Sequence, residues 1–138
     1  VADRQYKSGP EGKIPPTGGR GDHITDMNYD ARKSDVPGLE LLGTKQEQFL
    51  REWVTDWRGA DMKAVISQTI FTAMASTHGG PDGLLRADHD TNAWPQTKRN
   101  EALRIIRKAF ALHLAGDQHL PAVVHYGIET HKDAGVAF

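Results

Sequence analysis

The sequence predicts an α/β fold in which helices cover a β-sheet. Apolar residues recur at helical spacing in two segments, residues 44–59 and 100–110. Short apolar segments that are typical of strands lie at residues 62–68, 111–115 and 122–128. Helices that alternate with short buried strands indicate packed layers of helix and sheet. A chain of 138 residues favours one domain with a single core.

Residues 1–43 are predicted to be mostly irregular, ahead of an α/β core at residues 44–138. Only residues 1–7 have the composition of a strand, because prolines and glycines recur through the rest of this region. These residues are Gly9, Pro10, Gly12, Pro15, Pro16, Gly18, Gly19, Gly21, Pro37 and Gly38. A structureless run of this length is uncommon inside a compact domain, so it indicates a functional loop, a piece of a larger unit, or both.

The first helix is predicted to begin at Thr44. The four residues T-K-Q-E that start there have the pattern of a capping box, in which the side chains of Thr44 and Glu47 each satisfy a backbone amide. Phe49, Trp53 and Trp57 lie on the apolar face of this helix. We therefore assign these three aromatic side chains to the core under the sheet.

A strand, a long loop and a second helix are predicted next. The unbroken apolar run at residues 64–66 is typical of a strand that is covered on both faces. Residues 72–96 lack periodicity and contain several glycines and prolines, which indicates a loop. The side chains of the second helix that are expected to face inward are Ala102, Leu103, Ile106 and Phe110.

A carboxylate and an imidazole follow directly after the predicted strand at residues 111–115. Asp117 and His119 are two residues apart, so both side chains return to the same side of an extended backbone. Carboxylate oxygen and neutral imidazole nitrogen suit zinc, manganese, iron or nickel. Ligands of layered α/β folds gather outside the carboxyl ends of strands, which favours a metal site at this pair. A solvated turn is the alternative interpretation of an isolated Asp-x-His.

Composition excludes several kinds of partner and site. Seventeen Lys and Arg residues against 18 Asp and Glu residues leave a formal charge of −1, with no block of like charge that would favour nucleic acid. No stretch reaches the roughly 20 apolar residues of a membrane span. The chain has no cysteine, which excludes disulfides, thiolate metal ligands and thiol nucleophiles.

Several segments, in the same order, resemble the alkaline phosphatase D (PhoD-like) metallophosphatases of the calcineurin-like superfamily. They are Asp3-Arg4-Gln5, Leu41-Leu42-Gly43-Thr44-Lys45-Gln46, Ser67-Gln68-Thr69, Asp88-His89-Asp90-Thr91-Asn92-Ala93-Trp94-Pro95, Arg99 and Gly116-Asp117-Gln118-His119. The resemblance extends over essentially the whole chain and identifies it as similar to the C-terminal portion of such a domain.

This resemblance implies a four-layer α/β/β/α sandwich that hydrolyses phosphate monoesters or diesters with a metal-activated water. Two divalent or trivalent metal ions are implied, with iron, calcium, zinc and manganese as candidates. The last metal motif of the superfamily is usually Gly-His-x-His. Asp117 stands in place of its first histidine and His119 in place of its second, so both are expected to be metal ligands. The resemblance also implies that the protein is periplasmic or secreted.

The sequence departs from the superfamily in its other ligands. We find no D-x-H motif upstream, no G-D-x-x-D and no G-N-H-D or G-N-H-E. One carboxylate and one imidazole do not hold two metal ions, because a catalytic metal needs about three protein ligands. The chain is therefore expected to be inactive alone, and to associate with the missing N-terminal part of the domain or with itself. The alternative is a non-catalytic α/β module that keeps the fold without a working metal site.

Four further residues are candidates for substrate contact. Asp88 and Asp90 resemble the element that the family places near the mouth of its site, and a turn cluster is the alternative. Arg4 can bind phosphate with its planar guanidinium, although a lone arginine is also a common surface residue. Gln68 ends a predicted strand and could contact metal or phosphate through its amide oxygen, or be a satisfied buried amide.

Overall fold

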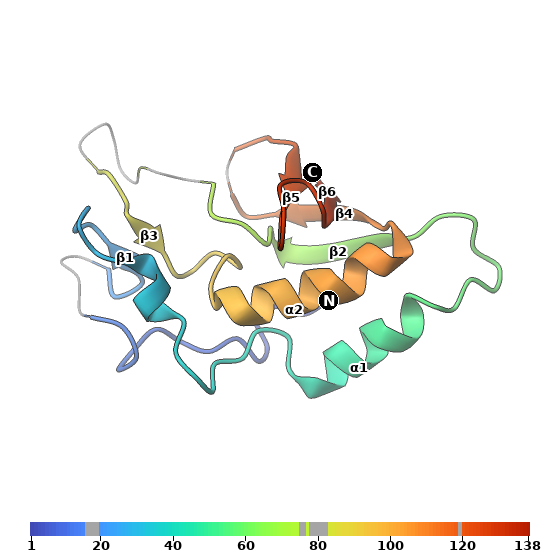
Figure 1. Cartoon of the computed structure of the whole chain (residues 1–138), viewed down its shortest axis with the longest axis horizontal. Helices are drawn as coiled ribbons and strands as arrows, with labels where there is room; N and C mark the ends of the chain where they lie inside the picture. The colour runs from blue at the N-terminus through green and yellow to red at the C-terminus, as the bar shows by residue number, and fades with distance from the viewer. Residues whose placement is uncertain (16–19, 75–76, 78–82, 119) are drawn as a thin grey trace.

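The computed structural model describes residues 1–15, 20–74, 77, 83–118 and 120–138. Over these residues a four-stranded mixed sheet packs against two α-helices, so the predicted α/β class is confirmed. Figure 1 shows both helices on one side of the sheet. A small two-stranded ribbon lies beyond the carboxyl end of the first strand of this sheet (Figure 1).

The main sheet contains β2 (Ala64–Thr69), β4 (Leu112–Gly116), β5 (Val124–Tyr126) and β6 (Gly135–Ala137). The helices are α1 (Thr44–Trp53) and α2 (Gln96–Ile106). The ribbon consists of β1 (His23–Ile24) and β3 (Ala87–Asp88). Two short 3₁₀ helices are η1 (Ala31–Ser34) and η2 (Arg107–Ala109).

The strands of the main sheet run in the order β2, β4, β6, β5. β4 is parallel to both of its neighbours, β2 and β6, while β5 and β6 are antiparallel. The chain returns from β2 to the parallel strand β4 through α2, as a parallel pair requires a long crossover. The carboxyl ends of β2 and β4 therefore meet at the same edge, where Thr69 lies opposite Gly116.

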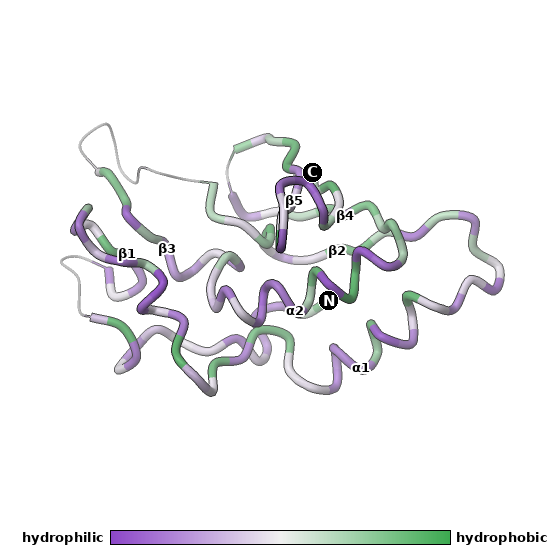
Figure 2. The backbone as a smooth tube through the Cα atoms, in the orientation of Figure 1, coloured by the Kyte–Doolittle hydropathy of each residue, from purple (hydrophilic) through white to green (hydrophobic). Residues whose placement is uncertain are grey.

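The core lies between the inner face of the sheet and the two helices. Side chains of β2 alternate strictly, so Val65 is buried and Ile66 is 66 % exposed. Leu50 of α1 and Leu103 of α2 pack into the same cluster as Val65. Figure 2 shows hydrophobic and hydrophilic residues alternating along both helices, as expected of helices with one buried face. Within the described chain β2 is covered on one face, and not on both as predicted.

The first helix begins at Thr44 as predicted, but its cap and its end differ from the prediction. Its N-cap is Gly43, whose carbonyl accepts from the Glu47 amide at 3.1 Å, and no side chain caps the helix. Gly43 has a φ of 75°, and a Cβ there would lie 2.8 Å from the Tyr6 ring. The predicted capping box is therefore wrong, because a glycine takes the cap position against Tyr6.

The aromatic residues of this region are less buried than predicted. The helix ends at Trp53, so Trp57 lies beyond it and is 43 % exposed, and Phe49 is 59 % exposed. Trp53 alone packs against the core, as a partly buried residue. The ammonium of Lys63 lies over the rings of Trp53 and Trp57, at 4.8 and 4.7 Å from their centroids. The buried side chain of Lys63 therefore packs against these two rings, where the prediction placed apolar core contacts.

The second helix is confirmed, with an earlier start at Gln96. Ala102, Leu103 and Ile106 are buried as predicted. Phe110 is 93 % exposed instead of inward, because the backbone turns into a left-handed conformation with a φ of 50° at this residue. That turn ends the helical periodicity on which the prediction for Phe110 rested.

Two other predictions fail on short elements. Residues 1–7 form turns instead of a strand, although the N-terminal ammonium of Val1 donates to the carbonyl of Ile66 at 2.7 Å. The predicted loop at residues 72–96 contains β3, and the three-residue strand β6 was not predicted. Both strands are too short to carry a periodic signal.

A histidine is built into the core beside β2. His113 is 2 % exposed, and its Nε2 lies 2.6 Å from the Ser67 hydroxyl. That hydroxyl donates to the Thr69 carbonyl at 2.8 Å, so it accepts from His113 and the proton of the neutral ring is on Nε2. The Phe71 ring packs edge-on against the imidazole, at 5.0 Å between centroids. This environment opposes a charge on the ring.

The native protein should lose stability as the pH falls from about 6.5 to about 4. Burial lowers the pKa of His113 from 6.5 to about 4, so over this window the unfolded chain binds a proton that the native chain excludes. The loss should total about 3 kcal/mol below the lower limit. His113→Gln keeps an amide donor for Ser67 and should remove this contribution in urea unfolding followed across the window. The exposed His125→Gln is the matched control and should keep the wild-type slope; an equal slope in His113→Gln contradicts the prediction.

Candidate functional site

A buried carboxylate ends strand β2. Asp3 is 0 % exposed, and its two oxygens accept from the backbone amides of Gln68 and Thr69, each at 3.0 Å. The side-chain amide of Asn92 donates to the same carboxylate and, at 3.1 Å, to the Thr69 carbonyl. A buried charge is tolerated only when its hydrogen bonds are satisfied, and here three donors satisfy it. Asp3 thus joins the N-terminal segment, β2 and the loop after β3.

The next residue, Arg4, is the centre of a charged cluster. Its Nη1 donates to Asp90 Oδ1 at 2.5 Å, and its Nη2 contacts Asp117 Oδ2 at 3.1 Å and Thr69 Oγ1 at 3.0 Å. Thr69 Oγ1 also donates to Asp117 Oδ2 at 3.2 Å. Burial opposes the charge of Arg4, but the bonds to Asp90 and Asp117 outweigh it and raise the pKa of Arg4. We call Arg4, Thr69, Asp90 and Asp117 the Arg4 cluster.

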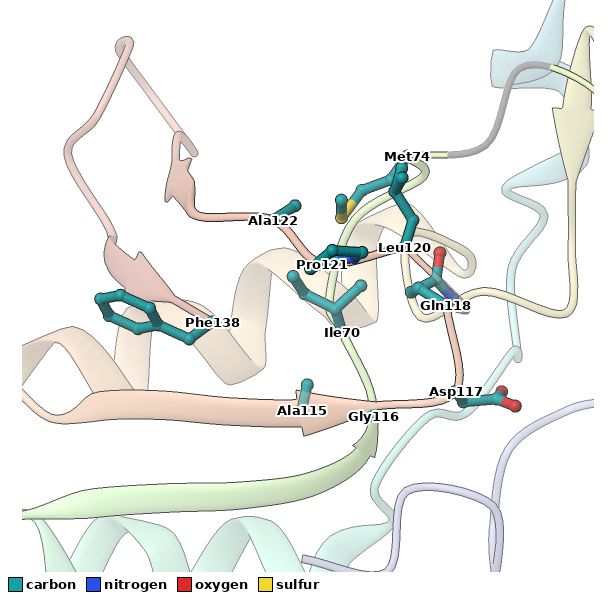
Figure 3. A pocket seen from close by; sticks show the side chains of 10 residues that line it. All are labelled: Ile70, Met74, Ala115, Gly116, Asp117, Gln118, Leu120, Pro121, Ala122 and Phe138. Carbon is teal, nitrogen blue, oxygen red and sulfur yellow. The ribbon is translucent and has the colours of Figure 1, made fainter.

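Asp117 enters this cluster from the carboxyl end of β4. It follows Gly116 directly and has a φ of 68°, a left-handed conformation that aspartate tolerates better than most residues. A cavity of about 320 Å³ adjoins it, lined by apolar side chains that include Ile70 and Phe138. Figure 3 shows the Asp117 carboxylate pointing away from these apolar side chains. The turn after β4 therefore separates an apolar pocket from the charged cluster.

Lys7 holds the loop that carries Asp90. Its ammonium donates to three consecutive carbonyls, those of His89, Asp90 and Thr91, at 2.9, 2.8 and 2.6 Å. Burial, and then the charge of Arg4, lower the pKa of Lys7 to about 8. A cavity of about 220 Å³ lies between Lys7, Arg4 and the loop. Lys7 fixes the backbone so that Asp90 can reach Arg4.

The structure separates the two aspartates that the sequence paired. Asp90 belongs to the Arg4 cluster, whereas Asp88 Oδ1 accepts from the Asp90 amide at 2.9 Å. This bond is a turn interaction. The turn cluster was the alternative interpretation of Asp88 and Asp90, and the structure shows it for Asp88. The side chain of Asp88 otherwise faces His23, at 3.9 Å from its Nε2.

The remaining predicted site residues have different outcomes. Gln68 contributes its backbone amide to Asp3, while its side chain lies on the exposed face of β2. The buried-amide interpretation of Gln68 is therefore wrong, and a contact to metal or phosphate stays a prediction. His119 lies outside the described residues, so its role as a metal ligand also stays a prediction.

Sequence reasoning did not single out Asp3, Lys7, Thr69 or Asn92. Asp3, Thr69 and Asn92 do stand inside the segments that resemble the phosphatase family. No sequence signal distinguishes a buried aspartate from an exposed one, because aspartate is rarely fully buried. Lys7 likewise has no signal, since its three acceptors are backbone carbonyls.

The Arg4 cluster does not by itself fit two metal ions. Among the described residues its carboxylates are Asp90 and Asp117, and both are ion-paired to Arg4. A catalytic metal needs about three protein ligands. Over the described ranges, the one group of three metal-ligating side chains close enough to share an ion is Asp22, His23 and Asp88. That group lies outside the Arg4 cluster.

No family model, curated protein or solved structure matches this chain. Within the part of the chain that the structure describes, no helix is both long enough and apolar enough to cross a membrane.

Removing the Asp3 carboxylate should destabilise the protein more than removing any exposed aspartate. Asp3→Ala leaves the amides of Gln68, Thr69 and Asn92 without their acceptor, and buried unpaired donors make the expected loss on the order of 3 kcal/mol or more. Asp3→Asn keeps one acceptor oxygen and should lose less. Urea unfolding followed by circular dichroism measures both, with the exposed Asp61→Ala as control. Equal stabilities of Asp3→Ala and Asp61→Ala would show that the carboxylate does not hold the segments together.

Proposed function

We propose that this chain forms the Arg4 end of a metal-dependent phosphoesterase site of the PhoD-like type, acting on phosphate monoesters or diesters. The observation that carries the proposal is the convergence of Arg4, Asp90 and Asp117, although Arg4 and Asp117 are 113 residues apart in the sequence. These are residues for which the resemblance implies a place at the site. A guanidinium matches the geometry of phosphate oxygens better than any other side chain.

Arg4 is the proposed contact to phosphate. Three of its N–H groups contact Asp90, Thr69 and Asp117, and a guanidinium carries five, so two donors have no partner among the described residues and can face an anion. The contacts to Asp90 and Thr69 hold the plane of the guanidinium, so less side-chain entropy is lost when an anion binds. Arg4 is thus a positioned donor at the carboxyl end of β2.

The charge of the cluster explains why metal dependence is part of the proposal. One guanidinium against the carboxylates of Asp90 and Asp117 leaves an excess of one negative charge. Such a cluster repels a phosphate ester unless cations neutralise the carboxylates. The described residues do not fit two metal ions, so we propose that further ligands come from His119 and from chain outside these 138 residues.

The exposed face of the main sheet supports a missing layer. Ile66 of β2 and Leu114 of β4 are paired across the strands and are 66 % and 40 % exposed on the face opposite the helices. Phe138, after β6, is 48 % exposed. Apolar side chains gathered on one sheet face indicate a surface that another element covers. We propose that a second sheet packs there, which would complete a four-layer sandwich.

The second candidate function is a non-catalytic α/β module that keeps this fold. It is favoured by one observation: among the described residues, the group that could hold a metal ion lies at Asp22, His23 and Asp88 and not at Asp117. On this alternative, the Arg4 cluster is a structural ion-pair network that fastens the N-terminal segment to β2 and β4.

Phosphate binding should depend on Arg4 and should strengthen when a neighbouring carboxylate is neutralised. We expect Arg4→Met to abolish the binding of inorganic phosphate, followed by the NMR shifts of the backbone amides around residue 4. Asp90→Asn should tighten binding roughly threefold to tenfold, since one negative charge that repels phosphate is removed. Arg58→Met is the control, because Arg58 is exposed and paired only to Asp56 among the contacts of the described chain.

Two outcomes of this titration separate the candidate functions. Binding that is lost in Arg4→Met and tightened in Asp90→Asn supports the phosphoesterase site. No binding in Asp90→Asn, where one repelling carboxylate is removed, or equal binding in wild type and Arg4→Met, rules out Arg4 as the phosphate contact and leaves the structural module. The chain alone should not hydrolyse an aryl phosphate in either case.

The exposed sheet face should make the 138-residue chain self-associate. Sedimentation velocity should show dimers or larger species whose fraction rises with concentration. Leu114→Lys places a charge in the centre of this face and should shift the chain toward monomer. Met27→Lys is the control, since Met27 is 54 % exposed but lies outside the main sheet. A wild-type chain that stays monomeric at all concentrations contradicts the proposed missing layer.

A further inference from the structure

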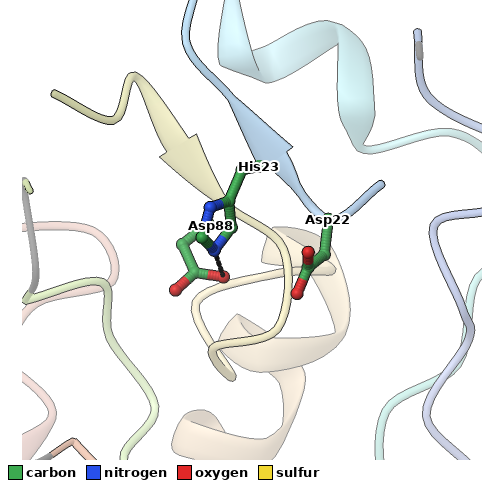
Figure 4. Close-up of side chains that lie close together, drawn as sticks. All are labelled: Asp22, His23 and Asp88. Carbon is green, nitrogen blue, oxygen red and sulfur yellow. Dashed lines mark ion pairs between the residues drawn. The ribbon is translucent and has the colours of Figure 1, made fainter. Parts of the chain in front are cut away.

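A second cluster of potential metal ligands lies on the small ribbon of β1 and β3. His23 and Asp88 face each other as a cross-strand pair, and Asp22 immediately precedes β1. One ligand atom from each of the three side chains lies within 4.8 Å of the others. Figure 4 shows the imidazole and the two carboxylates turned toward one region between the strands. None of these residues belongs to the Arg4 cluster.

The three side chains are largely buried, which is uncommon for two carboxylates beside each other. The side chains of His23, Asp22 and Asp88 are 7 %, 17 % and 17 % exposed. Carboxylates that lose water need a compensating positive charge or donor. Asp22 has the guanidinium of Arg20, and Asp88 accepts from the Asp90 amide. A cation between the three side chains would supply the rest of that compensation.

The distances within the cluster suit a shared ion better than a direct hydrogen bond. His23 Nε2 and Asp88 Oδ1 are 3.9 Å apart, which is beyond hydrogen-bond range. Two ligands of a tetrahedral ion, each about 2.0–2.1 Å from it, lie roughly 3.4 Å apart. A side-chain movement of about half an ångström would therefore bring both atoms onto one ion.

We propose that Asp22, His23 and Asp88 bind one divalent transition-metal ion, with zinc as the best match. One imidazole nitrogen and two carboxylate oxygens favour zinc, manganese or iron over magnesium or calcium, which prefer oxygen alone. Three protein ligands leave a fourth position for water. This site does not depend on the proposed phosphoesterase function.

Arg20 competes with the proposed ion for the carboxylate of Asp22. Its guanidinium donates to both oxygens of Asp22, at 3.0 and 2.6 Å. The Arg20 side chain is 49 % exposed, so it can turn into solvent when a doubly charged ion takes the carboxylate. Only the Arg20 side of this ion pair is exposed, and water screens its charge there. Arg20 thus holds Asp22 in place without closing the site.

The site has a structural consequence for the Arg4 cluster. β1 and β3 have two residues each, and a ribbon of this length is not stable on its own. An ion that joins Asp22, His23 and Asp88 cross-links the two strands. Asp88 also accepts from the Asp90 amide, so the ion fixes the loop that carries Asp90 to Arg4. The proposed ion therefore orders one wall of the Arg4 cluster without entering it.

The test is a titration of the metal-free 138-residue chain with zinc by calorimetry and with cobalt by visible absorption. We expect one ion per chain at the cluster, and a rise in melting temperature on binding. His23→Gln and Asp88→Asn should each weaken binding roughly tenfold or more. His125→Gln, an exposed histidine of β5, and Asp26→Asn, an exposed aspartate near β1, are the matched controls and should bind as wild type.

The variants also separate this site from the predicted pair Asp117 and His119. Circular dichroism without metal must first show that His23→Gln and Asp88→Asn are folded; if His23→Gln is unfolded, Asp22→Asn replaces it. Hydrogen exchange supplies a second readout, with zinc expected to protect the amides of β1 and β3. Binding that is unchanged in His23→Gln and Asp88→Asn, or lost only in Asp117→Asn, overturns the proposal. No binding in wild type overturns it as well.

Discussion

The buried carboxylate of Asp3 is the interaction on which the rest of this structure depends. It accepts from two amides at the end of β2 and from Asn92, so it joins three segments that are far apart in the sequence. A carboxylate without these donors would not tolerate full burial. Because Arg4 follows Asp3 directly, the same contact brings the guanidinium to the carboxyl ends of β2 and β4. The site is positioned by a neighbouring residue that does not contact the other side chains of the Arg4 cluster.

The end of β3 and the loop after it contribute one aspartate to each of the two clusters. Asp88 faces His23 on the ribbon, and Asp90 faces Arg4. The two aspartates are linked by the bond from the Asp90 amide to Asp88 Oδ1. The ammonium of Lys7 donates to the next three carbonyls, from residue 89 to residue 91. The ribbon and the Arg4 cluster are therefore joined by one short, hydrogen-bonded stretch of backbone.

The sequence predicted the long elements better than the contacts that arrange them. Both helices and the strand β2 were predicted, because each has a periodic or unbroken apolar pattern. The capping box at Thr44 and the inward position of Phe110 were wrongly predicted, since a positive φ at Gly43 and at Phe110 overrides the local pattern. Arg4, Asp90 and Asp117 were named through a family resemblance and do converge, whereas Asp3 and Lys7 were missed. Most of their partners are backbone groups, which have no counterpart in the pattern of side chains.

One missing layer accounts for both the exposed sheet face and the incomplete site in the proposed arrangement. Asp117 is 51 % exposed and Asp90 is 47 % exposed, so water screens their charges and weakens their interaction with any cation or phosphate. A second sheet packed over Ile66 and Leu114 would bury apolar surface, which drives association. If that layer also reached the strand ends, it would exclude water from the carboxylates and strengthen every electrostatic interaction there. Apolar packing on the sheet and electrostatic strength at its edge would then come from the same contact.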